Sequence, residues 1–130
     1  MDILFADDEI AIREIIVRKI NKNKLGIDNV YQADNGIDAL ATYKQYFPEI
    51  VITDIKMPQM DGLELIEKIR QISKDTKIII ISGYDEFELA QKALRYKVDD
   101  YILKPAKINT IEDAILKAQK DILHNTLMQV

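Results

Sequence analysis

Hydrophobic residues along this chain alternate between two spacings, one typical of strands and one typical of helices. Five short stretches are predicted as strands, at residues 3–6, 29–33, 50–53, 77–81 and 100–103. Residues 78–81 are four successive isoleucines, a pattern expected for a parallel strand buried on both faces. Each stretch is followed by apolar residues at helical spacing, so strands and helices are predicted to alternate along the whole chain.

The first predicted helix carries Ile12, Ile15, Ile16 and Ile20, with Lys19, at i, i+3, i+4, i+8 and i+7. This spacing predicts that the isoleucine stripe faces the core. A stop is expected at residues 25–26, and further helices are predicted near residues 36–47, 63–70, 87–94 and 108–122.

Five strand–helix units in succession predict an α/β fold with a parallel sheet covered on both faces and joined by right-handed crossovers. A chain of 130 residues is too short for an eight-unit barrel. The expected architecture is a flavodoxin-like, doubly wound, open five-stranded sheet with strand order 2-1-3-4-5. Its switch point, where ligands bind in such sheets, would lie between the first and third strands.

Composition narrows the class of protein. The length suits one domain, and 48% hydrophobic with 31% charged residues is typical of a globular protein. A net charge of −4 without a basic run gives no sign of nucleic-acid binding by these residues. The absence of cysteine excludes disulfides. No apolar run is long enough to span a membrane, so we expect a soluble cytoplasmic protein without membrane contact.

Polar residues follow four of the predicted strands directly. Asp7 and Asp8 follow the first, Asp54 the third, Ser82 the fourth and Lys104 the fifth. Each has an ordinary structural explanation when taken alone: acidic helix caps, an Asx residue that starts a loop, a turn, and a strand stop before proline. These explanations do not account for four such positions at the same edge of one sheet, so a functional site is predicted there.

The chemistry of these groups suits phosphoryl transfer. Three converging carboxylates repel one another unless a cation neutralises them, and hard oxygen ligands suit Mg²⁺. The Asp54 carboxylate can act as a nucleophile that forms an aspartyl phosphate. Lys104 would supply positive charge and Ser82 a hydroxyl donor for the phosphoryl oxygens.

Four segments together resemble a known family: residues 6–9 (ADDE), 53–62 (TDIKMPQMDG), 81–84 (ISGY) and 99–105 (DDYILKP). They resemble the receiver domain of bacterial two-component response regulators. The resemblance covers residues 1–122 and leaves 123–130 as a C-terminal helix extension or the start of a linker. It implies a signalling switch rather than a turnover enzyme, with Asp54 phosphorylated by a cognate sensor histidine kinase.

The resemblance also implies a role for each site residue. Mg²⁺ would be bound by the side chains of Asp8 and Asp54 and the backbone carbonyl of Lys56, with Asp7 acting through a water molecule. Ser82 and Lys104 would contact the phosphoryl oxygens, and the Lys104–Pro105 bond is expected to be cis. Tyr101 matches the aromatic switch position of the family.

In the implied switch, Ser82 moves toward the phosphoryl group and the Tyr101 ring enters the space that it leaves. The surface formed by helix 87–94, strand 100–103 and the last helix would then change and control dimerisation or partner choice. Residues 80–90 resemble a subgroup usually fused to an arabinose-regulator-type helix-turn-helix domain, so transcription is the expected output. DNA binding would need that output domain, which these residues do not contain. Lys97 departs from the subgroup, where glycine is more usual, and is expected to alter only the turn.

Two side predictions concern segments near the site and at the end of the chain. Lys56 and Tyr84 are long residues that would flank the phosphoacceptor, and we expect them to slow phosphate loss by screening the attacking water. Leu123, Leu127 and Met128 exceed what a receiver needs; they are either the start of a linker helix that pairs between protomers or a frayed end.

Two other functions are compatible with parts of the pattern. An aspartate-nucleophile phosphatase or phosphotransferase usually has a second acid two residues after the nucleophile, where this chain has Lys56. A flavodoxin-like cofactor carrier needs a phosphate-cradling loop after the first strand, where Asp7, Asp8 and Glu9 would repel phosphate.

Overall fold

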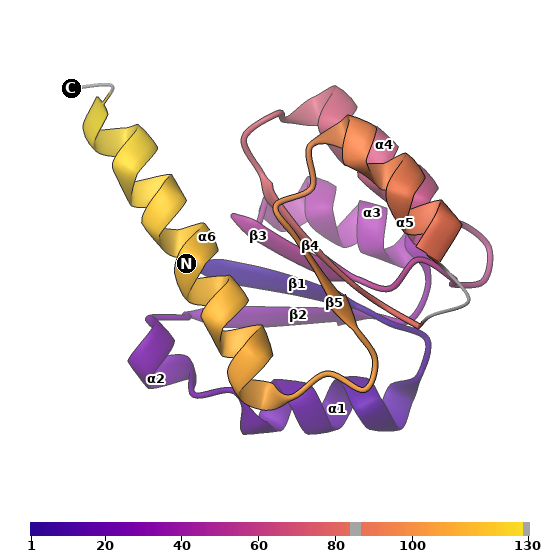
Figure 1. Cartoon of the computed structure of the whole chain (residues 1–130), viewed down its shortest axis with the longest axis horizontal. Helices are drawn as coiled ribbons and strands as arrows, with labels where there is room; N and C mark the ends of the chain where they lie inside the picture. Colours follow the sequence, from indigo (N-terminus) through magenta and orange to yellow (C-terminus); the bar gives the residue numbers. More distant parts are fainter. Residues whose placement is uncertain (84–86, 129–130) are drawn as a thin grey trace.

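The computed structural model describes residues 1–83 and 87–128 as one sheet with helices on both faces (Figure 1). The five strands are parallel and lie in the order β2-β1-β3-β4-β5, as predicted. They are β1 (Asp2–Ala6), β2 (Asn29–Ala33), β3 (Ile50–Thr53), β4 (Lys77–Ser82) and β5 (Asp100–Leu103). Each predicted strand agrees with the structure to within one residue at either end.

The helices form two layers. One face of the sheet is covered by α1 (Ile10–Lys19), α2 (Lys22–Leu25) and α6 (Ile108–Met128). The other is covered by α3 (Gly36–Tyr46), α4 (Gly62–Ile72) and α5 (Phe87–Ala93), which continues into a 3-10 turn, η2 (Leu94–Tyr96). The four-residue helix α2 was not predicted, because such a segment is too short to show a hydrophobic period.

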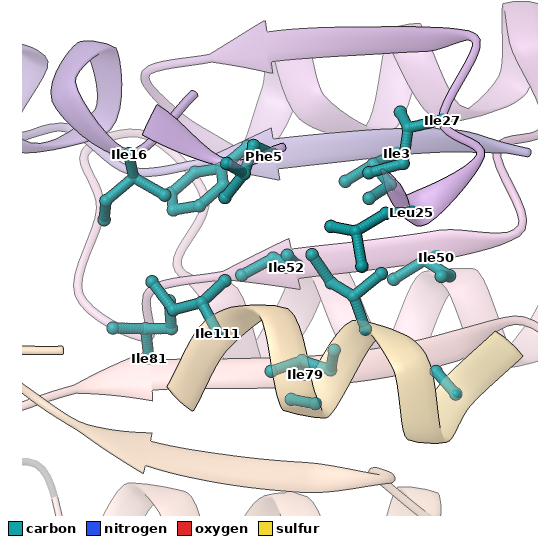
Figure 2. Packing of buried hydrophobic residues seen from close by; sticks show 14 of the residues in the cluster. Ile3, Phe5, Ile16, Leu25, Ile27, Ile50, Ile52, Ile79, Ile81 and Ile111 are labelled. Carbon is teal, nitrogen blue, oxygen red and sulfur yellow. The ribbon is translucent and has the colours of Figure 1, made fainter. Parts of the chain in front are cut away.

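The hydrophobic core consists of two clusters, one on each face of the sheet, because alternate residues of each strand point to opposite faces. On β1, Ile3 and Phe5 pack under α1 and α6, as Figure 2 shows, whereas Leu4 and Ala6 face the other helical layer. Residues Ile78 to Ile81 of β4 are all at most 1% exposed, which confirms the prediction of a strand buried on both faces.

The prediction for the buried face of α1 was confirmed for Ile16 and Ile20 but was wrong for Ile12 and Ile15. Ile12 and Ile15 are 38% and 41% exposed, whereas Arg13 is buried together with Ile16 and Ile20. The buried positions still follow an i, i+3, i+7 spacing, but it begins at a charged residue. The helix is turned this way because the Arg13 guanidinium binds carbonyl oxygens at the ends of β1 and β2.

The turn after η2 explains the unusual residue at position 97. Lys97 has φ 57°, the left-handed conformation that glycine adopts without a steric penalty. Its carbonyl oxygen accepts a hydrogen bond of 3.0 Å from Arg70 Nη2. The lysine therefore keeps the turn that glycine would make.

The last helix, α6, contains 21 residues but is buried only along its first half. Ile111, Ala114, Ile115 and Ala118 are buried, whereas Leu123, Leu127 and Met128 are 57% to 74% exposed. In Figure 1 its C-terminal end extends past the sheet. Across the described residues, no helix is long and apolar enough to cross a membrane.

Candidate functional site

The predicted site residues lie together at the C-terminal ends of the parallel strands, which we call the carboxyl edge of the sheet. Asp54 follows β3, and its backbone N–H donates to the carbonyl of Ala6 at the end of β1. Lys104 follows β5, and its N–H donates to the carbonyl of Ser82 at the end of β4. The ladder hydrogen bonds thus continue one residue past the strands and place the side chains next to one another.

The Lys104 ammonium lies among three carboxylates. Its Nζ atom is 2.7 Å from Asp54 Oδ2, 2.8 Å from Glu9 Oε1 and 3.1 Å from Asp7 Oδ2. Burial tends to lower the pKa of Lys104, but the hydrogen bonds to Asp54 and Glu9 outweigh it and raise the pKa above its ordinary value. Lys104 is therefore a fixed positive charge at the site.

Asp7 is an acid whose charged form is poorly solvated. Its side chain is 1% exposed, and burial raises the pKa of its carboxyl, with the nearby Asp54 charge adding to the shift. The Glu9 N–H donates to Oδ1 at 2.9 Å. Oδ2 accepts no hydrogen bond, although Lys104 Nζ is close to it, so its contact with the lysine is ionic only.

Asp7, Glu9 and Asp54 form a group that could hold a metal ion. One carboxylate oxygen from each lies within 4.8 Å of the others. Three hard oxygens, one of them buried without a hydrogen bond, are the donors that Mg²⁺ prefers. The residues present therefore fit the predicted cation.

Two members of the acidic segment lie differently from the expectation. Asp8, which the resemblance assigned as a direct ligand, is exposed and is not part of this group. Glu9, which was not predicted as a site residue, makes no side-chain cap on α1 and contacts Lys104 instead. Glu9 could have been recognised from the sequence, because it belongs to an unbroken acidic run directly after a buried strand.

The loop after Asp54 is held by close backbone contacts. Asp54 Oδ1 accepts a hydrogen bond from the Ile55 N–H at 2.6 Å, and the Gly62 N–H donates to the Ile55 carbonyl at 2.6 Å. A methyl group at position 62 would overlap the Asp54 carbonyl oxygen. Lys56 lies in this loop with an exposed side chain, and its carbonyl remains a predicted ligand.

Ser82 and Tyr101 are connected directly. The Ser82 hydroxyl is buried and donates a hydrogen bond of 2.8 Å to the half-buried Tyr101 hydroxyl. The Lys104–Pro105 peptide bond is cis, as the resemblance implied. Tyr84, the other predicted neighbour of the phosphoacceptor, lies outside the described residues.

An apolar groove opens beside the acidic group. It has a volume of about 650 Å³ and runs between α1 and residues 104–108. Ile12, Ile15 and Pro105 line it, and Glu9 and Lys104 stand at the end near Asp54. The exposed isoleucines of α1 thus form one wall of a groove that reaches the charged site.

Comparison with known proteins decides the family. The model of the response regulator receiver domain matches residues 3–116. The chain belongs to this family. Receiver domains are signalling domains rather than a classical enzyme family, and response regulators interact with histidine kinases and often dimerise.

Two of the curated relatives are described as transcriptional regulatory proteins. The chain is 40% identical over 126 residues to the transcriptional regulatory protein YesN of Bacillus subtilis, covering 94% of this chain and 34% of YesN. It is 38% identical over 103 residues to the transcriptional regulatory protein HptR of Staphylococcus aureus, covering 79% of this chain and 40% of HptR. This receiver chain thus spans between about a third and half of the length of such relatives.

Solved receiver structures have the same fold. The receiver domain of AraT, a response regulator from Geobacillus stearothermophilus, matches with a TM-score of 0.90 and 35% identity, covering 96% of this chain and 97% of that one. The two-component regulator AraC from Clostridium phytofermentans also matches with a TM-score of 0.90, at 32% identity, covering 97% and 98%. These matches confirm the predicted fold and family.

Proposed function

We propose that this receiver domain accepts a phosphoryl group on Asp54 from a sensor histidine kinase and thereby controls a transcriptional output carried by another part of a longer protein. The observation that carries the proposal is the Asp54 carboxylate. It is 3% exposed, lies at the switch point of the sheet, and is 2.7 Å from the Lys104 ammonium. YesN and HptR, as transcriptional regulatory proteins, support the proposed output.

In the proposed step, a carboxylate oxygen of Asp54 attacks the phosphorus of a phosphohistidine. The new O–P bond forms as the N–P bond breaks, and the electron pair remains on the imidazole nitrogen, which takes up a proton. Lys104 stabilises the added negative charge. The Ser82 hydroxyl, once released from Tyr101, becomes a donor to a phosphoryl oxygen.

The acidic group supports Mg²⁺ as the cofactor. Asp7, Glu9 and Asp54 would hold the ion, with Asp8 and the Lys56 carbonyl as the further ligands that the family resemblance implies. A bound Mg²⁺ would neutralise charge that develops on the phosphoryl oxygens. The Lys104 ammonium contacts three carboxylates, so a second cation at the site would relieve the repulsion among them.

The Ser82–Tyr101 hydrogen bond supports the proposed switch. If Ser82 turns toward the phosphoryl group, Tyr101 loses its hydroxyl partner and its ring becomes able to repack. Tyr101 lines a small cavity with Phe87 and Leu94, which are 54% and 63% exposed. Repacking there would change the α5–β5–α6 surface, through which we propose that two copies pair. The hypothesis that Lys56 and Tyr84 slow phosphate loss belongs to the same proposal.

The groove along α1 supports a docking site for the kinase. A phosphohistidine must come within bonding distance of Asp54, so the element that carries it has to pack close to the acidic edge. The groove begins at Glu9 and Lys104 and presents Ile12 and Ile15 to a partner. We propose that it receives an apolar helical face of the kinase, and that both proteins act in the cytoplasm.

Mass spectrometry after incubation with a small phosphodonor and Mg²⁺ tests the proposal. The wild-type protein should gain the mass of one phosphoryl group, and Asp54→Ala should gain none. Asp99→Ala, which removes an acid at the opposite edge of the sheet, is the matched control and should be phosphorylated like the wild type. Phosphorylation of Asp54→Ala would refute the assignment. Failure of the wild-type protein to be phosphorylated by any donor would also refute it. Accumulation of free phosphate at high turnover without a phosphorylated protein would favour the phosphatase alternative.

A further inference from the structure

Arg13 is a buried charge that the proposed chemistry does not use. Its side chain comes from the first turns of α1 and is 9% exposed. In the described part of the chain, it is the only cation among the buried polar residues. Burial of a guanidinium is unfavourable unless its donors are satisfied, so the position needs a physical reason.

The guanidinium of Arg13 connects the ends of two strands. Nη1 donates to the Asp7 carbonyl at 2.5 Å and to the Ala33 carbonyl at 3.5 Å. Nε donates to the Gln32 side chain at 3.0 Å. Asp7 directly follows β1, and Gln32 and Ala33 are the last residues of β2. One side chain therefore fixes the carboxyl edge of β1 against that of β2.

These contacts decide how the acidic segment is presented. The Asp7 N–H donates to the Ala33 carbonyl at 3.0 Å, so Arg13 completes the hold on both polar groups of this residue. Asp7 Oδ1 accepts the Glu9 N–H, and the Glu9 carbonyl accepts the backbone N–H of Arg13. With its backbone and Oδ1 held, Asp7 has only Oδ2 to offer to a ligand near Asp54.

Stability of α1 does not explain the arginine. A cation near the amino end of a helix interacts unfavourably with the helix dipole. The helix also has no acid in its first turn and no side-chain cap at Glu9. The sequence at this end of α1 is therefore poorly suited to the helix itself, and the favourable contacts of Arg13 all lie at the strand ends.

We propose that Arg13 is a positioning residue for the metal and phosphoacceptor site. By holding the Asp7 backbone, it directs the carboxylates of Asp7 and Glu9 toward Asp54 and so sets the affinity for Mg²⁺ and the rate of phosphorylation. This inference rests on the proposed function. Residues that orient a ligand in this way typically change metal affinity by roughly 10- to 100-fold when they are replaced.

Arg70 provides a matched control at the opposite edge of the sheet. Its guanidinium also binds backbone carbonyls, with Nε 2.6 Å from the Tyr96 oxygen, Nη1 2.6 Å from the Thr76 oxygen and Nη2 3.0 Å from the Lys97 oxygen. Both guanidinium groups donate hydrogen bonds to backbone carbonyls, but only Arg13 is next to the acidic group. A purely structural role predicts similar consequences for the two.

The experiment compares Arg13→Met, Arg13→Lys and Arg70→Met with the wild type. Mg²⁺ affinity is measured by calorimetry, the phosphorylation rate with acetyl phosphate, and stability by urea unfolding in EDTA. We expect Arg13→Met to bind Mg²⁺ at least about tenfold more weakly and to be phosphorylated more slowly. Arg13→Lys should recover part of the affinity, because an ammonium still reaches the Asp7 carbonyl. Arg70→Met should lose stability and keep the wild-type affinity.

Wild-type Mg²⁺ affinity in Arg13→Met, or an equal loss in Arg70→Met, would overturn the proposal. If Arg13→Met does not fold, Arg13→Lys decides, and an unchanged affinity in that protein is the contrary result. A wild-type protein that binds Mg²⁺ without being phosphorylated would refute the proposed function, whereas the effect of Arg13 on metal affinity would still be measured.

Discussion

The carboxyl and amino edges of the sheet, formed by the C-terminal and N-terminal ends of its strands, carry similar residues in different arrangements. At the carboxyl edge, three carboxylates face one ammonium, that of Lys104. At the amino edge, Asp99 has Lys77 Nζ 3.4 Å and Arg70 Nη2 3.8 Å away, and the Ile78 N–H donates to it at 2.8 Å. At the carboxyl edge three acids share one nearby cation, whereas Asp99 at the amino edge has two cations and a backbone donor to itself.

The same contrast holds for paired hydroxyl groups. Tyr43 and Thr76, at the amino edge, form a hydrogen bond of 2.5 Å between two buried hydroxyls. Ser82 and Tyr101, at the carboxyl edge, are 2.8 Å apart, and Tyr101 is only half-buried. Stability is therefore concentrated in the amino edge, while the carboxyl edge keeps groups whose partners a ligand can replace.

The largest expected difference between the edges follows from removing one lysine from each. In EDTA, Lys104→Met should lose about 3 kcal/mol of unfolding free energy, because three carboxylates are left without their nearest cation. Lys77→Met should lose under about 1 kcal/mol, since Asp99 keeps Arg70 and the Ile78 N–H. Urea unfolding at pH 7 measures both. Equal losses would contradict the comparison.

Mg²⁺ should stabilise the carboxyl edge alone. At a hundred times its Kd, the ion should raise the unfolding free energy by about 2.7 kcal/mol. Asp54→Asn should respond much less, and in EDTA it should be more stable than the wild type because repulsion is relieved. Asp99→Asn should respond fully. A melting temperature that stays flat across a magnesium titration of the wild type would contradict the prediction.

Replacing the tyrosine of each hydroxyl pair, Tyr43 or Tyr101, should give a smaller difference between the two edges. Tyr43→Phe should cost about 1 to 2 kcal/mol, because the Thr76 hydroxyl becomes buried without its partner. Tyr101→Phe should cost about 1 kcal/mol, because the buried Ser82 hydroxyl loses its acceptor although Tyr101 itself is only half-buried. Phosphorylation should change the NMR spectrum of the α5–β5–α6 surface normally in Tyr43→Phe and to a reduced extent in Tyr101→Phe. The opposite pattern would exclude Tyr101 as the switch.

The smallest expected effect is a pH dependence at Asp7. Burial raises the pKa of Asp7 above 3.8, so the native state binds this proton more tightly than the unfolded state does. Stability from this group is therefore lost as pH rises from 3.8 through the native pKa. In Mg²⁺-free buffer, the unfolding free energy of Asp7→Asn relative to wild type should increase over that interval, by at most about 1.4 kcal/mol per pH unit. A difference that does not vary with pH would contradict it.

The strands could be predicted because their pattern depends on burial alone. A parallel strand covered on both faces must be apolar throughout, and residues 78–81 satisfy this without any tertiary information. The positions of Asp7, Asp54 and Lys104 followed from the strands, since residues after parallel strands meet at one edge. That part of the site was predictable for the same reason as the sheet.

The orientation of α1 could not be predicted, because it depends on where one buried cation finds acceptors. Arg13 interrupts the isoleucine stripe, and a hydrophobic pattern assigns such a residue to solvent. Two of its acceptors are the backbone carbonyls of Asp7, just after β1, and Ala33, in β2, and backbone carbonyls carry no sequence signal. Glu9 was not predicted as a site residue for a related reason: an acidic residue before a helix is compatible with a helix cap as well as with a contact at the site.

Two glycines that pack against the loop after Asp54, Gly36 at the start of α3 and Gly62 at the start of α4, limit how this protein can be varied. A methyl group at position 36 would overlap the Met60 carbonyl oxygen, just as one at position 62 would overlap that of Asp54. In a saturation mutagenesis library, both positions should therefore tolerate no other amino acid. Diversity at this loop would be confined to side chains that point outward, such as those of Lys56 and Pro58. If Lys56 slows phosphate loss as proposed, signalling lifetimes in an engineered pathway could be tuned at that position.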